Sequence, residues 1–177
     1  MFSAKDFIAS ARQHEMIINK ELNYFFDVIL PETKLSVIVK QPGTGVAMKT
    51  QALATEHYAE DRIALINAAD LDNGLRTSNE IALAVEDAEL VIIDEINRIT
   101  PADLNNIIDT VLNGAIDNVH EKFQAPRTVR LRPDVRFVLL TNHHNGQTGV
   151  LDALRQAIAT LNEDSGIRIA VVTMSRV

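Results

Sequence analysis

The sequence contains no cysteine among its 177 residues. Disulfide bonds, thiolate zinc sites and thiol nucleophiles are therefore excluded, and any chemistry must use oxygen and nitrogen groups. An excess of positive charge is also lacking, because 24 acidic side chains against 17 basic ones give a formal charge of -7. This balance gives no overall attraction to nucleic acid or to an acidic membrane surface, although it does not exclude a local basic patch.

Long apolar runs are missing as well. Charged residues interrupt the first thirty positions, and no stretch approaches the about 20 apolar residues that cross a bilayer. We therefore expect a cytoplasmic protein that makes no membrane contact. With 46% hydrophobic residues, the chain suits one compact unit with a sizeable core. It contains no internal repeat and no low-complexity stretch.

The first thirty residues have helical periodicity. Apolar residues recur at helical spacing from Ser3 to Leu30, and Pro31 favours a stop there. We expect residues 1–32 to form a helical segment that packs on a core domain of residues 33–177.

Strand and helix patterns alternate in the core domain. Apolar or β-branched runs predict strands at 35–39, 63–68, 90–93, 137–140 and 167–173, and helical patterns occupy 50–60, 78–88, 101–113 and 151–161. The poorly patterned stretch between 115 and 130 predicts a short hairpin insert. Alternating strands and helices imply right-handed crossovers, so we expect an α/β fold with three layers and a five-stranded, mainly parallel sheet.

A candidate phosphate loop follows the first strand. Residues 40–50 read KQPGTGVAMKT, which fits the phosphate-loop pattern except that Met48 replaces its second glycine. Backbone amides and a helix N-terminus would converge on an anion here. Lys49 would neutralise phosphate charge, and the Thr50 hydroxyl would bind magnesium. The candidate nucleotide-binding residues are Gly43, Thr44, Gly45, Val46, Ala47, Met48, Lys49 and Thr50.

Two registers of this loop stay open. A β-carbon at Met48 penalises backbone conformations that glycine allows, so the loop is either substituted at that position or shifted. In the shifted register, Pro42 to Gly45 form the turn, and three additional residues, Val46 to Met48, precede Lys49. A turn that merely connects a strand to a helix is the alternative without function.

Two adjacent carboxylates end the third predicted strand. The run Leu90 to Ile93 is apolar throughout, and Asp94 and Glu95 follow it at the expected ligand edge of a parallel sheet. Asp94 would hold magnesium, and Glu95 would polarise the water that attacks a γ-phosphate. The alternative is a solvated acidic turn.

The segment LVIIDEINRITPADLNNIIDTVLNG resembles the Walker B strand and following helix of AAA+ ATPases, most closely those of the MoxR, McrB and dynein-related branch. Pro42 to Gly45 is similar to the PGTG of AAA+ phosphate loops. The segment TVRLRPDVRFVLLTNHHNG is similar to the hairpin and sensor 1 strand of that branch. The resemblance covers residues 33 to 175, and it implies binding of ATP and Mg²⁺.

Further site residues are implied by this resemblance. Asn142 falls at the sensor 1 position and would orient the attacking water, although a strand-ending asparagine is often only a turn former. Arg155 is the best candidate for an arginine that completes a neighbouring subunit's site, and Arg98 is a second candidate. The family usually continues into a helical lid beyond the fifth strand, and we expect a module without that lid.

The sequence thus favours an ATP-binding, AAA+-like protein that acts as a magnesium-dependent ATPase and remodels a protein or nucleoprotein partner, with a protein partner or homo-oligomer implied. The alternative is a degenerate scaffold or adaptor without turnover. A DNA-handling ATPase is a third interpretation, which the net charge does not indicate. An arginine cluster near the hairpin is compatible with it, or with a solvated edge strand: Arg127, Arg130, Arg132 and Arg136.

Overall fold

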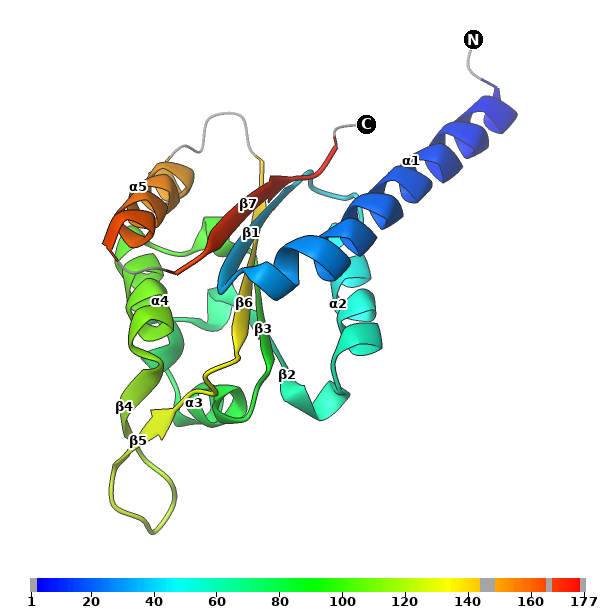
Figure 1. Cartoon of the computed structure of the whole chain (residues 1–177). Coiled ribbons are helices and arrows are strands. Elements are labelled where there is room, and N and C mark those ends of the chain that lie inside the picture. Colours follow the sequence, from blue (N-terminus) through cyan, green and yellow to red (C-terminus); the bar gives the residue numbers. More distant parts are fainter. Residues whose placement is uncertain (1–2, 144–148, 165–166, 176–177) are drawn as a thin grey trace.

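Five parallel strands form one sheet in the order β2-β3-β6-β1-β7 (Figure 1). The computed structural model describes residues 3–143, 149–164 and 167–175. The strands are β1 (Leu35–Lys40), β2 (Ile63–Asn67), β3 (Leu90–Asp94), β6 (Arg136–Asn142) and β7 (Ile169–Thr173). Because every pairing is parallel, all carboxyl ends lie along one edge and all amino ends along the other.

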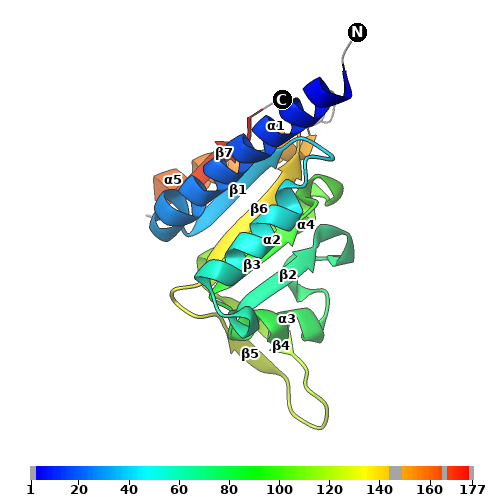
Figure 2. The same cartoon turned by 90° about the vertical axis from the view of Figure 1, so that its right-hand side faces the viewer.

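Helices cover both faces of this sheet (Figures 1 and 2). One face carries α1 (Ala4–Tyr24) and α2 (Val46–His57). The opposite face carries α3 (Asn79–Glu86), α4 (Pro101–Asn113) and α5 (Gly149–Asp164). The predicted three-layer α/β fold is confirmed.

The central strands are apolar throughout because both of their faces are buried. In β3, Val91 and Ile93 pack in the core beneath α3, α4 and α5, whereas Leu90 and Ile92 pack in the core beneath α1 and α2. All four are at most 1% exposed. Successive strand residues point to opposite faces, so a strand between two helical layers needs an apolar residue at every position.

The predicted ends of α4 are confirmed. The Thr100 hydroxyl accepts a hydrogen bond from the Asp103 amide at 3.1 Å, Pro101 occupies the first turn, and Gly114 closes the helix with a φ of 62°. A two-stranded antiparallel hairpin follows, β4 (Ala115–Val119) with β5 (Arg127–Arg130), as the sequence predicted.

Helix α2 begins four residues earlier than we predicted. The predicted start was Thr50, but the helix starts at Val46, directly after Gly45. Val46, Ala47 and Met48 therefore form its first turn. The extended conformation of Tyr58 ends the helix.

The N-terminal segment contacts the core through its second half. Helix α1 runs into a short π-helical turn (Phe25–Ile29), and Ile18, Leu22 and Phe25 are at most 1% exposed beside Ile38 and Val46. The division into two domains at residue 32 stays a prediction. Among the described helices, none combines the length and apolarity needed to span a bilayer.

Candidate nucleotide site at the carboxyl edge of the sheet

The loop after β1 makes a tight turn built on two glycines. Gly43 and Gly45 have φ values of 75° and 71°, a left-handed region that side chains with a β-carbon rarely adopt. A β-carbon added to either glycine would meet no atom within 4 Å, so the loop is open at both points. The Thr44 hydroxyl donates to the Gln41 carbonyl at 2.7 Å and closes the turn internally.

The N-terminus of α2 presents uncapped amides. The first helical hydrogen bond runs from the Lys49 amide to the Gly45 carbonyl at 3.0 Å, and no side chain caps the helix. The amides of Val46, Ala47 and Met48 therefore have no acceptor within the helix. Such amides, together with the helix dipole, favour an anion.

Lys49 and Thr50 point away from this opening. The Lys49 ammonium lies 3.8 Å from Glu15 Oε1 on α1. The Thr50 hydroxyl is fully buried and donates to the Val46 carbonyl at 2.7 Å, so it reaches a cation at the loop only after its side chain turns. Met48 is 77% exposed.

Neither of the two loop registers describes the backbone fully. The turn is Pro42 to Gly45, as in the shifted register, but Val46 to Met48 are helical and do not lengthen the loop. The residue that directly follows the helix-opening glycine is Val46, which is 1% exposed and packs in the core. The first turn of α2 thus carries no cation, and Lys49 begins its second turn.

Asp94 and Glu95 lie at the same edge, at the end of β3. Asp94 Oδ1 accepts a hydrogen bond from the Glu95 backbone amide at 2.7 Å. Glu95 has a φ of 58°, which is uncommon for a residue with a β-carbon and is typical of functional sites. Its Oε2 atom accepts from Asn67 Nδ2 at 3.4 Å and lies 3.4 Å from Arg98. Glu95 is thereby oriented from two sides.

Asn142 lies between the loop and the acids. Strand β6 pairs with β1 on one side and with β3 on the other, and Asn142 is the register partner of Lys40. The Asn142 backbone amide donates a hydrogen bond to Asn97 Oδ1 at 3.3 Å. Its own Oδ1 atom accepts from Lys40 Nζ at 2.8 Å, and that ammonium lies 4.0 Å from Asp94 Oδ1. The predicted residues Asn142 and Asp94 are therefore brought together.

Sequence reasoning missed Lys40. Its side chain is only 11% exposed, and its ammonium links the strand before the loop to Asn142 and Asp94. The available signal was a lysine as the last residue of a buried strand, directly before a glycine loop. The sequence did not reveal its partners, because they depend on the strand order.

Of the two proposed intersubunit arginines, Arg98 contacts a residue of this site and Arg155 pairs on its own helix. Arg155 is 78% exposed on α5 and pairs with Asp152 on the same helix at 3.6 Å. Arg98 is 62% exposed and pairs with Glu95. An exposed arginine is available to a neighbouring subunit, but this role stays a prediction for both.

Two of the four arginines near the hairpin are paired with carboxylates. Arg127 makes two hydrogen bonds to Glu86, at 2.7 and 2.9 Å, and one to Glu121, at 2.7 Å. The hydrogen bonds from Arg127 to Glu86 hold the pKa of Glu86 below its usual value. Arg132 pairs with Asp134 at 3.1 Å. Both arginines are already neutralised by carboxylates.

The residues at this edge fit a magnesium ion at one position. Carboxylate oxygens, waters and substrate phosphates are the ligands that Mg²⁺ prefers, and one protein carboxylate is sufficient. Asp94 provides that carboxylate, whereas the buried Thr50 hydroxyl does not fit in this conformation. Within the described ranges, no three acidic or histidine side chains cluster as a separate metal site.

Comparisons with known proteins support the fold. Searches against protein-family models and against curated proteins gave no match. Among solved structures, NtrX from Brucella abortus in complex with ATP matches with a TM-score of 0.56 and 14% identity, over 90% of this chain and 35% of NtrX.

Two further structures match in the same way. The S. cerevisiae Hsp104-ADP complex has a TM-score of 0.52 and 12% identity, covering 93% of this chain and 33% of Hsp104. Bacteroides Pif1 bound to ssDNA has a TM-score of 0.50 and 14% identity, covering 91% of this chain and 42% of Pif1. At this identity the likeness shows the fold alone, an α/β fold with a five-stranded parallel sheet flanked by helices. The chain spans well under half of each matched chain.

Proposed function

We propose that this chain is a nucleotide-binding domain that takes ATP with Mg²⁺ at the carboxyl edge of its sheet. One observation carries the proposal. A glycine turn with an uncapped helix N-terminus lies at the same sheet edge as Asp94, Glu95 and Asn142. Lys40 donates a hydrogen bond to Asn142 and lies 4.0 Å from Asp94. An anion site beside a carboxylate is the arrangement that a metal-bound phosphate requires.

In this proposal the phosphates lie on the amides of residues 43 to 48. Lys40 supplies the positive charge that Lys49, turned toward Glu15, does not supply here. Asp94 holds the magnesium ion, which screens phosphate charge when bound. Glu95 takes the proton of the attacking water, and Asn142 orients that water.

Hydrolysis and assembly are the finer part of the proposal. The resemblance to the MoxR, McrB and dynein-related branch favours slow turnover that accelerates in a homo-oligomer, where Arg155 of one subunit reaches the site of the next. The energy released would remodel a protein or nucleoprotein partner. This part rests on fold-level analogy.

A scaffold without turnover is the second candidate. The specific observations in its favour are the Lys49–Glu15 contact and the buried Thr50 hydroxyl, because both residues of the expected lysine-threonine pair are used inside the protein. Such a chain would keep the fold and bind a partner in place of nucleotide.

Binding and turnover measurements separate the two candidates. We expect a non-hydrolysable ATP analogue to bind the full chain, and Mg²⁺ to tighten that binding. We expect Glu95→Gln to keep the affinity but to lose at least about 100-fold in turnover, as removal of a general base does. No binding at millimolar nucleotide would establish the scaffold. Light scattering with and without nucleotide would test assembly.

A further inference from the structure

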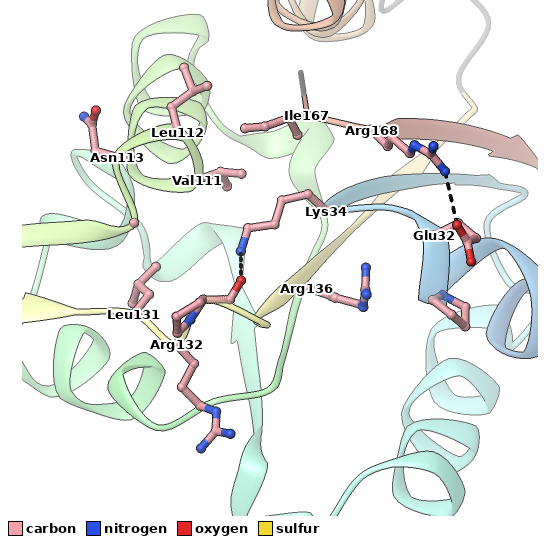
Figure 3. Close-up of a pocket in the computed structure, with 13 residues that line it drawn as sticks. Glu32, Lys34, Val111, Leu112, Asn113, Leu131, Arg132, Arg136, Ile167 and Arg168 are labelled. Carbon is pink, nitrogen blue, oxygen red and sulfur yellow. Dashed lines mark hydrogen bonds and ion pairs between the residues drawn. The ribbon is translucent and has the colours of Figure 1, made fainter. Parts of the chain in front are cut away.

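A pocket lies at the opposite edge of the sheet, where the strands begin (Figure 3). It has a volume of about 580 Å³. Lys34 directly precedes β1, Arg136 opens β6, and Arg168 directly precedes β7, so three neighbouring strands each bring a cation to one place. The end of α4 and residues 131–133 form the other walls.

Two of the lining cations are neutralised by carboxylates. Arg168 pairs with Glu32 at 3.1 Å, which Figure 3 marks with a dashed line. Arg132 pairs with Asp134 at 3.1 Å and with Glu89 at 3.4 Å. These pairs leave little net charge of their own.

Among the described residues, Lys34 and Arg136 have no such carboxylate partner. The Lys34 ammonium donates to the Pro133 carbonyl at 3.3 Å, and the Arg136 guanidinium donates to the Thr33 carbonyl. Within the described part of the chain, neither has a carboxylate within 4.0 Å. Both remain only half-buried, so a ligand can reach them.

The electrostatics of Lys34 favour an anion in this pocket. Burial lowers the pKa of Lys34, and the positive charge of Arg136 lowers it further, while Asp134 opposes this in part. Two like charges thus line a common pocket, and Asp134 offsets their repulsion only in part. An anion between them would remove the repulsion and gain two charge-assisted hydrogen-bonding partners, one of them a planar guanidinium that suits two oxygens at once.

We propose that this pocket binds a small organic anion whose phosphate or carboxylate group lies between Lys34 and Arg136. Its volume is within the range of small-molecule sites, about 300–1,000 Å³. Leu112 lines the pocket, is 40% exposed and gives the apolar part of such a ligand a surface. The site is independent of the proposed nucleotide site, because it uses the amino ends of the strands.

The first test is a titration of the full chain with inorganic phosphate and, separately, with citrate, at constant ionic strength set with chloride. We expect saturable binding of at least one of the two probes, and the stronger probe identifies phosphate or carboxylate as the preferred group. Lys34→Gln and Arg136→Gln should each weaken that binding by about 10-fold, as the loss of one charge-assisted contact predicts.

Three controls make the result specific. Arg12→Gln removes an exposed arginine on α1 and should change nothing. If Lys40→Met abolishes phosphate binding while Lys34→Gln leaves it unchanged, the probe binds at the carboxyl edge, and that outcome would overturn the assignment to this pocket. Because Arg136 also contacts the Thr33 carbonyl, unfolding curves must show that the Arg136→Gln protein folds; Lys34→Gln carries the test if it does not.

The Lys34 side chain gives a direct readout. Its pKa, followed by NMR of ¹³C-labelled lysine, should rise when the bound probe is added and should stay constant when chloride replaces it. Non-saturable binding of both probes, or equal affinities in the wild type and the Lys34→Gln variant, would contradict the proposal.

Discussion

The two edges of the parallel sheet balance their charges differently. At the carboxyl edge, Lys40 contacts Asn142 and lies 4.0 Å from Asp94, so positive and negative groups occur together. At the amino edge, Lys34 and Arg136 donate only to backbone carbonyls and lie near one another's positive charge. A ligand of the carboxyl edge should therefore bring both a cation and an anion, whereas the amino edge should take a bare anion.

The two edges would also bind a phosphate through different groups. The carboxyl edge offers backbone amides behind a glycine turn, and the amino edge offers side-chain cations from separate segments. Backbone sites depend on φ values that only glycine adopts easily, and side-chain sites depend on single charges. The two edges should respond to different substitutions.

Substitution of two of the left-handed glycines should give the largest contrast. Gly45→Val and Gly114→Val place a β-branched residue at φ values of 71° and 62°, which costs about 1–2 kcal/mol of stability in either case. Only Gly45 lies in the proposed phosphate turn. Calorimetry should show that Gly45→Val loses at least about 10-fold in magnesium-ATP affinity, whereas Gly114→Val keeps it. Equal losses in both variants would mean that general destabilisation explains the effect.

The two lysines near the loop should differ next. Lys40→Met removes the ammonium between Asn142 and Asp94 and should weaken ATP binding by about 10-fold. Lys49→Met removes only the 3.8 Å contact to Glu15 and should change ATP affinity by less than about 2-fold. The reverse order of effects would assign the phosphate-binding role to Lys49 and would show that its side chain turns when nucleotide binds.

Anion affinity at the amino edge should depend on pH, and nothing described at the carboxyl edge gives the same dependence there. Because the pKa of Lys34 lies below its ordinary value of 10.5, the lysine loses its charge earlier as the pH rises. Affinity for phosphate or citrate should therefore fall from below pH 10.5, by up to about 10-fold once Lys34 is neutral. In the Lys34→Gln variant this fall should disappear; its persistence would implicate another group.

Loss of the ion pair between Glu86 and Arg127 should give the smallest effect. Glu86 has a pKa lowered by its hydrogen bonds from Arg127, so the ionised pair stabilises the fold above the usual pKa of glutamate and loses this contribution as the pH falls through the lowered value. Glu86→Gln should cost only about 0.5 kcal/mol at neutral pH, since the pair is partly exposed. Urea unfolding at pH 7 and at pH 3 measures this cost, which should shrink at the lower pH. Anion binding should not change, in contrast to Arg136→Gln.

The sheet was predictable from the sequence because burial on both faces leaves a local mark. Leu90 to Ile93 is apolar throughout, and the capped helix that follows has its own signals at Thr100, Pro101 and Gly114. The acids at the end of β3 and the asparagine that ends β6 were also identified from their positions at strand ends. The strand order then places Asp94 and Asn142 at one edge.

The missed features depend on contacts between distant segments. The start of α2 could not be deduced, because the lysine-threonine pair suggested a helix start at Thr50, whereas Gly45 in a left-handed conformation begins the helix at Val46. Lys40 acquires its partners only when β1 lies beside β6. The amino-edge pocket likewise combines Lys34 and Arg136, which are 102 positions apart in the numbering of the chain.

The most direct test of the account is a crystal structure of the full chain with magnesium and a non-hydrolysable ATP analogue. We expect the triphosphate on the amides of residues 43 to 48, with the metal between the phosphates and Asp94. A triphosphate bound between Lys34 and Arg136 at the amino edge would contradict the proposed nucleotide site.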